Sequence, residues 1–142
     1  MTKEHHNPLT HTKHGEKLLS PFEIIKTELA HNGSKDDPKR TYAAIVKMVE
    51  QPKYRVLRHD NSLLLLENKG NGSAESYLFT ADSPHKLSEN FKHFAHSLKV
   101  GGFKHLEYFT DRRAMVRFLK TAKIKHEESV LTNGKIKVEI EL

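Results

Sequence analysis

The class of fold follows from residues 77–122, which read YLFTADSPHKLSENFKHFAHSLKVGGFKHLEYFTDRRAMVRFLKTA. Ser83 and Pro84 mark a helix start, because serine caps the first turn and proline suits the first helical position. Apolar residues then recur at helical spacing, with Phe91 and Phe94 as the expected core anchors. The segment predicts alternating elements: a strand over 77–80, a helix over 84–99, a strand over 103–109 and a helix over 111–122.

The residues before this segment predict two further helices. The first begins at Ser20, where Glu23 completes a capping box, and ends at Gly33. The second begins at Asp37-Pro38 and stops before Pro52.

A β-hairpin is expected next, with strands over 54–58 and 63–67 around a short polar turn. Leu63–Leu66 is apolar on both faces, which is typical of a central strand covered on both sides. Residues 68–73 contain two glycines and polar side chains, and we expect a flexible loop there.

A second hairpin closes the chain, turning at Asn133-Gly134. Residues 136–142 alternate strictly between apolar and polar, so one face of the last strand is core and the other is solvent. The expected fold class is α/β: a mixed, mostly antiparallel twisted sheet with helices on both faces. We expect one domain over 20–142, preceded by an arm over 1–19.

The arm is polar and carries four of the eleven histidines. It lacks the apolar residues that would offset its ordering entropy, so we expect it to order only on a partner. Because imidazole gains charge near neutral pH, docking through the arm would depend on pH. The expected partner-binding histidines are His5, His6, His11 and His14.

Composition narrows the class of protein. The 142 residues contain no cysteine, which excludes disulfides and thiolate metal sites. No apolar run is long enough to span a membrane, and the N-terminus has no secretory signal. The net charge of +6 favours acidic partners, although a merely soluble basic surface explains it equally well. An intracellular or viral origin is expected.

The order of elements resembles that of the GNAT superfamily, the acetyl-CoA-dependent N-acetyltransferases, over residues 20–142. Residues 111–122 are similar to the family's late pattern, Asn-x-x-Ala-x-x-x-Tyr followed by Gly-Phe. Ala114 matches that pattern, whereas Asp111 stands for Asn, Phe118 for Tyr and Ala122 for Gly. The chain also resembles, in scale and pattern, small GNAT-like virion proteins of tailed bacteriophages.

The departures from the family pattern concern its chemistry. GNAT enzymes hold the coenzyme A pyrophosphate on the backbone of a glycine-containing loop at a helix N-terminus. Residues 80–90 contain no glycine here, Pro84 lacks an N–H, and Asp82 would repel a phosphate. The family's tyrosine often protonates the departing thiolate, and Phe118 has no hydroxyl to do so. We therefore expect no cofactor and lean against an enzyme.

A basic stripe is expected on the last helix, at Arg113, Arg117 and Lys120, with Arg112 beside it. It can bind an acidic protein or nucleic acid, or it can be the solvated face of an amphipathic helix. No aromatic residues interleave with it to stack on bases.

Two further groups of residues are candidates for a metal site or a catalytic base. His93 and His96 lie one turn apart and can share a metal, but partly buried surface histidines explain them as well, and we expect no metal site. His105 and Glu107 share one face of a strand and can offer a base, with Tyr108 on the other face. A structural role is the alternative for all three.

Three functions remain open. The first is a non-enzymatic structural or assembly protein, a bacteriophage virion component that docks on other protein chains through its arm and basic helix, in the virion or the host cytoplasm. The second is a divergent acyl-CoA-dependent N-acyltransferase. The third is a nucleic-acid-associated accessory protein. We expect neither a membrane nor a small-molecule substrate as partner.

Overall fold

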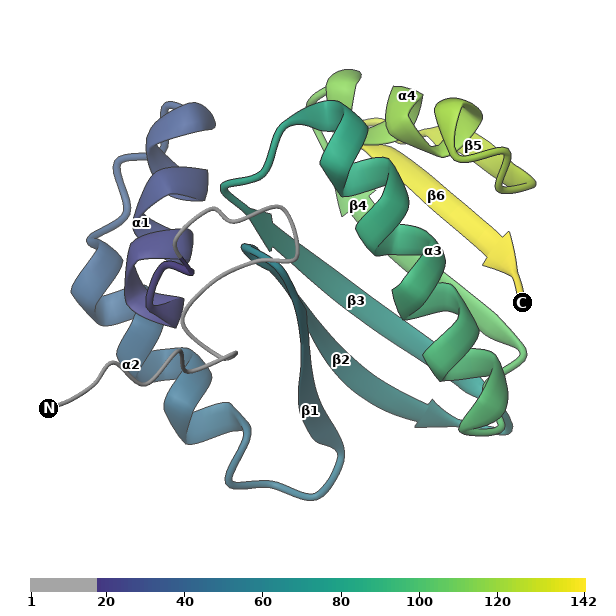
Figure 1. Cartoon of the computed structure of the whole chain (residues 1–142), viewed down its shortest axis with the longest axis horizontal. Helices are drawn as coiled ribbons and strands as arrows, with labels where there is room; N and C mark the ends of the chain where they lie inside the picture. Colours follow the sequence, from purple (N-terminus) through teal and green to yellow (C-terminus); the bar gives the residue numbers. More distant parts are fainter. Residues whose placement is uncertain (1–17) are drawn as a thin grey trace, which may run out of the picture.

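The structure, a computed structural model, describes residues 18–142. These residues form four helices and one six-stranded sheet (Figure 1). The helices are α1 (Pro21–His31), α2 (Pro38–Met48), α3 (Pro84–Val100) and α4 (Ala114–Thr121). The strands are β1 (Tyr54–His59), β2 (Ser62–Gly70), β3 (Ser73–Thr80), β4 (His105–Thr110), β5 (His126–Val130) and β6 (Ile136–Glu141).

The sheet has the order β1-β2-β3-β4-β6-β5, and every neighbouring pair is antiparallel except β3 with β4. α3 and α4 lie on one face, while α1 and α2 lie on the other (Figure 1). The predicted fold class, a mostly antiparallel mixed sheet with helices on both faces, is confirmed. Within the described residues, no helix is both long enough and apolar enough to cross a membrane.

The predicted starts of α1, α2 and α3 are confirmed. The Ser20 hydroxyl accepts a hydrogen bond from the Glu23 N–H, and the Glu23 carboxylate accepts one from the Ser20 N–H, each at 3.2 Å. Asp37 caps α2 by accepting from the Lys39 N–H at 3.0 Å. These bonds satisfy backbone donors that the first turn of a helix leaves without a partner.

The prediction of a flexible loop over 68–73 is wrong. β2 continues to Gly70 and β3 begins at Ser73, so only Asn71-Gly72 connects them. Asn71 has φ of +56° and Gly72 has φ of +79°, as a tight two-residue hairpin turn requires. Asn-Gly is the strongest short hairpin signal, and it outweighs the polar composition around it.

Two other predicted boundaries shift. The strand expected over 103–109 runs from His105 to Thr110, and the helix expected from Asp111 begins at Ala114. The Thr110 hydroxyl accepts a hydrogen bond from the Arg112 N–H at 3.1 Å, which holds a turn between β4 and α4.

The main core lies between the sheet and α3 with α4. Phe91 and Phe94 are buried there, as predicted, with exposed fractions of 0% and 3%. A smaller cluster, Ile24, Ile25 and Leu29 with Leu63, lies beneath α1 on the other face. Leu63–Leu66 are all buried, which confirms a central strand covered on both sides.

The described part of the predicted arm consists of Leu18 and Leu19. Leu19 packs against the smaller cluster, and its N–H donates to Asn61 Oδ1 at 2.8 Å. The arm histidines His5, His6, His11 and His14 lie outside the described residues.

β3 and β4 are paired along only part of their length. The parallel register joins Ser73–Glu75 to His105–Glu107 and stops there. β3 continues to Thr80 and β4 to Thr110, so the sheet opens between the far ends of these two strands.

Candidate functional site

The opening between β3 and β4 contains two adjoining cavities, of about 390 Å³ and about 210 Å³. Both are lined by Glu28 of α1 and by Met115 of α4. The larger cavity extends toward polar residues, among them Asn32, Asp36, Asp111 and Lys135. The smaller one is mostly apolar and extends to the start of α3, with Leu87, Ala114 and Phe118 in its walls.

Glu28 and Arg112 form an ion pair between these cavities. The Arg112 Nη2 donates to Glu28 Oε2 at 3.0 Å, and the Glu28 side chain is only 5% exposed. Glu28 also accepts from the Asn32 side-chain amide at 2.9 Å and from the Thr80 N–H at 3.2 Å. The carboxylate therefore ties α1 to the end of β3 and to the turn before α4.

Glu28 accepts three hydrogen bonds, whereas one donor of Arg112 has no acceptor within the described residues. The Arg112 Nε–H is buried and has no hydrogen-bond partner within residues 18–142. A carboxylate that accepts three hydrogen bonds is poorly placed to act as a base, because most of its lone pairs are occupied. The pair is thus better suited to hold the elements around the opening than to transfer protons.

Asp82 lies directly before α3, at the other end of the smaller cavity. Its Oδ2 accepts from the Ser62 hydroxyl at 2.8 Å, the Asn61 N–H at 3.0 Å and the Asn90 side-chain amide at 2.8 Å. Burial raises the pKa of the Asp82 carboxyl, while the bonds from Ser62 and Asn61 and the charge of Lys86 oppose that rise. The side chain fastens β2 and the end of β3 to α3.

The first turn of α3 offers few free N–H groups. Pro84 has none, and the Lys86 N–H donates to the Ser83 hydroxyl at 3.3 Å. Ser83 therefore caps the helix start, as predicted, whereas the Asp82 carboxylate bonds instead to Asn61, Ser62 and Asn90. A pyrophosphate of the kind that coenzyme A carries does not fit these residues, because a helix start with Asp82 before it and few free N–H groups offers negative charge and little donation.

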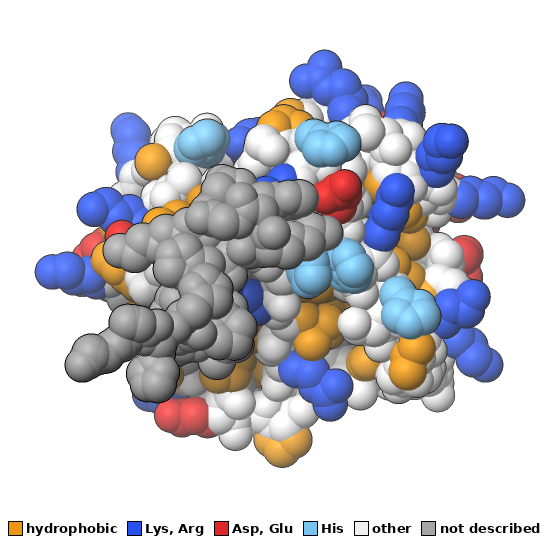
Figure 2. Space-filling model, in the orientation of Figure 1, with side chains coloured by type: hydrophobic (Ala, Val, Ile, Leu, Met, Phe, Trp, Pro, Cys, Tyr) orange, Lys and Arg blue, Asp and Glu red, His pale blue; other side chains and the backbone are white. Residues whose placement is uncertain are grey.

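The four basic residues of the predicted stripe lie in three different environments. Arg112 points inward to Glu28, and Arg113 donates to Glu128 on β5. Arg117 and Lys120 are exposed on α4, with no ion pair inside the described part of the chain. Figure 2 shows lysines and arginines along the margin of this face, over the part that Figure 1 assigns to α4 and β5.

Within the part of the chain that the structure describes, the histidine pair on α3 joins no convergent group of metal-ligating side chains. The His93 ring stacks on the ring of His59, with centroids 4.2 Å apart, and His96 lines a shallow hollow beside it. Among residues 18–142, one group of metal-ligating side chains converges, and it consists of His105, Glu107 and Glu139. Sequence reasoning placed His105 and Glu107 on one face, but Glu139 comes from another strand and gave no local signal.

Tyr108 occupies the opposite face of β4, as predicted. Its hydroxyl donates to the Met115 carbonyl oxygen at 2.7 Å, and burial raises the pKa of the phenol. It fastens β4 to α4, and its oxygen does not reach the cluster around His105.

Searches by sequence found no match among models of known protein families and none among curated proteins. The fold does resemble solved structures. A domain from Methanocaldococcus jannaschii superposes with a TM-score of 0.60 at 9% identity, covering 89% of this chain and 96% of that one.

Two enzymes are similar in the same way. The ribosomal-protein-S18-alanine N-acetyltransferase from Escherichia coli gives a TM-score of 0.55 at 10% identity, covering 88% of this chain and 91% of the enzyme. The Campylobacter jejuni N-acetyltransferase PseH, solved with acetyl coenzyme A, gives 0.53 at 12% identity, covering 87% and 92%. At such identities the likeness concerns the fold alone: the chain has the fold of GNAT acetyltransferase domains.

Proposed function

We propose that this chain is a binding or assembly protein that uses the acetyltransferase fold without using acyl-coenzyme A. The observation that carries the proposal is the position of Asp82. Its carboxylate lies at the start of α3 and accepts three hydrogen bonds from the protein itself. Two backbone N–H groups of this helix start are also already used, since that of Asp82 donates to the Thr80 hydroxyl and that of Lys86 to the Ser83 hydroxyl.

Removing the charge alone would not create a phosphate site. Pro84 would still lack an N–H, and Ser83 would still cap the Lys86 N–H. The backbone would also remain without the glycine that allows close approach to a phosphate. Three separate features of this helix start therefore oppose the coenzyme.

The docking surface in this proposal is the exposed basic part of α4, Arg117 and Lys120, together with the arm. Exposed lysines and arginines attract acidic partners without a specific pocket. Arg112 takes no part, because its guanidinium is committed to Glu28. The finer proposal, a virion component of a bacteriophage, rests only on the likeness in size and pattern described above.

Calorimetric titration with acetyl-CoA tests the first part of the proposal. We expect no measurable binding to the full-length chain, while the Campylobacter jejuni N-acetyltransferase serves as the positive control. A Kd of micromolar order, about −8 kcal/mol, would overturn the proposal.

A divergent acyl-CoA-dependent N-acyltransferase is the second candidate. The separation of β3 from β4 favours it, because the two adjoining cavities in the opening give space for a substrate. If acetyl-CoA binds, release of free thiol with a panel of primary amines would establish this alternative.

The docking part is tested with a charge-reversed α4. We expect Arg117→Glu combined with Lys120→Glu to abolish co-purification with the native assembly, because reversing both charges makes α4 repel an acidic partner. Both side chains are exposed, so the core is left untouched. Lys99→Glu, on the exposed end of α3, is the matched control and should co-purify normally. Equal recovery of both variants would remove α4 from the proposal.

A further inference from the structure

The sheet face opposite α3 and α4 carries a row of glutamates that crosses five strands. The strand registers place Glu67 opposite Glu75, Glu75 opposite Glu107, Glu107 opposite Glu139, and Glu139 opposite Glu127. Like charges directly opposite each other on a sheet are destabilising. The repulsion between these carboxylates is relieved only by cations beside them, and a chain of net charge +6 has basic residues to supply them.

The cations present differ along the row. Lys53 and Lys69 lie within 3.6 Å of Glu67, and the Tyr77 hydroxyl donates to Glu75. Around Glu107 and Glu139 the partners are Lys137 and an imidazole, that of His105. The middle of the row is therefore the part where an imidazole lies between two carboxylates.

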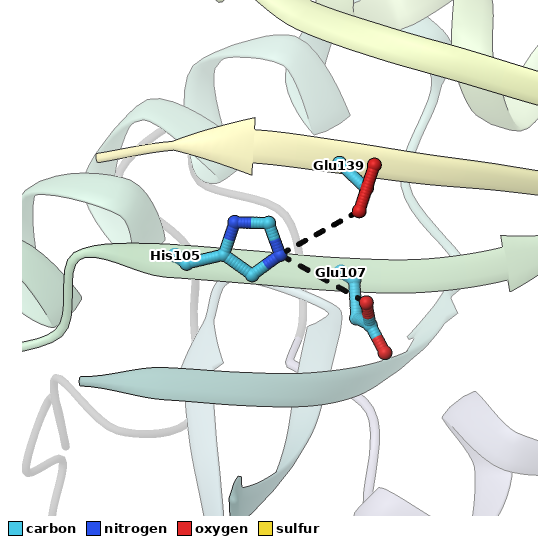
Figure 3. A group of neighbouring side chains, drawn as sticks. All are labelled: His105, Glu107 and Glu139. Carbon is cyan, nitrogen blue, oxygen red and sulfur yellow. Dashed lines mark ion pairs between the residues drawn. The ribbon is translucent and has the colours of Figure 1, made fainter. Parts of the chain in front are cut away.

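Three electron-pair donors converge at this point (Figure 3). His105 Nε2 lies 3.8 Å from Glu107 Oε2 and 3.9 Å from Glu139 Oε1. One ligand atom from each of the three residues lies within 4.8 Å of the others. All three side chains are partly buried and stand on β4 and β6, two hydrogen-bonded strands, so the backbone already fixes their spacing.

The other imidazole nitrogen is held by a fourth carboxylate. His105 Nδ1 lies 2.7 Å from Glu141 Oε1, which is the geometry of an Nδ1–H donating to a carboxylate. In the tautomer with the proton on Nδ1, the lone pair of the ring lies on Nε2, which faces Glu107 and Glu139 (Figure 3). A carboxylate on the outer nitrogen of a histidine is the usual support of a metal-binding imidazole, because it fixes both tautomer and ring orientation.

We propose that His105 Nε2 and the carboxylates of Glu107 and Glu139 bind a divalent transition-metal ion of the zinc class, with Glu141 orienting the imidazole. One nitrogen and two oxygens form a mixed donor set that suits Zn²⁺ better than Mg²⁺ or Ca²⁺, which take oxygen ligands. Tetrahedral zinc bonds place ligand atoms about 3.4 Å apart, so the observed separations close by small side-chain rotations.

The ammonium group of Lys137 and protons from solution both compete with the metal. Lys137 Nζ lies 3.7 Å from Glu107 Oε2 and 3.5 Å from Glu139 Oε1. Protons compete for His105 Nε2, so binding weakens as pH falls. The groups that face His105 are Glu107 on its own strand, Glu139, Glu141 and Lys137 on β6, and Glu75 on β3.

Zn²⁺ titration by calorimetry at pH 7.5 tests the proposal. The full-length chain should carry His5→Asn, His6→Asn, His11→Asn and His14→Asn, because histidine side chains outside the proposed site also bind Zn²⁺. We expect one Zn²⁺ per chain, with Mg²⁺ giving no heat. His105→Ala should weaken binding by at least about tenfold, and Glu141→Gln by about tenfold, the loss typical of an outer carboxylate.

Matched controls separate the site from general surface charge. His85→Ala removes another histidine near a glutamate, 3.9 Å from Glu89 on α3, and should leave Zn²⁺ binding unchanged. Glu67→Gln removes a charge from the same row at a distance from the ligands and should change the affinity less than about twofold. Lys137→Met should tighten binding, because it removes the competing ammonium.

Equal affinities of the His105→Ala and His85→Ala variants would overturn the proposal. So would the absence of Zn²⁺ binding in the Lys137→Met variant, because His105 would then act only as an ion-paired imidazolium. Thermal melts of each variant confirm that the fold is intact in these comparisons.

Discussion

One face of the sheet is largely apolar, whereas the other carries a row of charged side chains. The face beneath α3 and α4 takes apolar side chains from every strand but β5 and joins them with both helices in one core. Within residues 18–142, the other face is covered by α1 on β2 and β3, through the cluster around Ile24 and Leu63, with α2 packed against the same cluster. Its remaining area carries glutamates, His105 and Lys137. The apolar burial that stabilises the fold is therefore concentrated on one face, and the other face carries charged side chains.

The largest expected effect is on the apolar face, at Phe91. This ring is fully buried and contacts the rings of Phe94, Tyr108 and Phe118. Phe91→Ala should lower the free energy of unfolding by about 3–5 kcal/mol, the usual loss for a buried phenylalanine. Urea denaturation measures it.

The matched change on the other face is Ile24→Val, which removes one methylene from an equally buried side chain. It should cost about 1 kcal/mol. A wild-type unfolding free energy for Phe91→Ala would contradict the comparison of the two faces.

The next effect concerns the ion pair that joins the two faces at the sheet opening. Glu28→Ala should lower the free energy of unfolding by about 2–3 kcal/mol, because it leaves the Arg112 guanidinium and the Thr80 N–H without their acceptor. The loss is smaller than that for a fully buried pair, since the Arg112 side chain is 25% exposed.

A double-mutant cycle isolates this pair. Arg112→Met combined with Glu28→Ala should cost less than the sum of the two single substitutions, by about 1 kcal/mol or more. Strict additivity would show that the pair contributes nothing at the opening.

The smallest effect lies at the rim of the apolar face, between α4 and β5. A hydrogen bond from Arg113, assisted by one from His126, holds the pKa of Glu128 below its ordinary value of 4.5. A lowered carboxyl pKa contributes stability that is present above the unfolded pKa and is lost as pH falls through the folded pKa. Because the pair is exposed to solvent, Arg113→Ala should change stability at pH 7 by less than about 0.5 kcal/mol.

The sensitive measurement for this pair is an NMR titration of the Glu128 carboxyl. Its pKa should rise toward 4.5 in Arg113→Ala, and it should not move in Arg117→Ala, whose side chain is exposed on α4. An unchanged pKa in both variants would show that Arg113 does not act on Glu128.

Local patterns predicted the elements of this fold well. The caps at Ser20, Asp37 and Ser83 each start a helix where expected. The run Leu63–Leu66 is a covered central strand. The errors arose where two local signals disagreed, as at Asn71-Gly72, whose turn chemistry defeated the expectation of a loop.

The candidate sites differ in whether the sequence alone could identify their residues. Asp82 was identified from the sequence, because its place before a helix start is a local fact. The Glu28–Arg112 pair was not, since its members are 84 residues apart. Arg112 was grouped with Arg113 and Arg117 on a shared stripe, and only the turn at Thr110 directs it inward.

The sequence by itself determined the helices, the strands, their caps and the class of fold, because each depends on side-chain periods and backbone preferences within one turn or one strand. Only the tertiary structure decided the opening between β3 and β4, the partner of Glu28 and the convergence of His105, Glu107 and Glu139. Those features depend on the register between strands and on which elements pack together. Residues that meet in this way are distant in the chain and carry no local signal of one another.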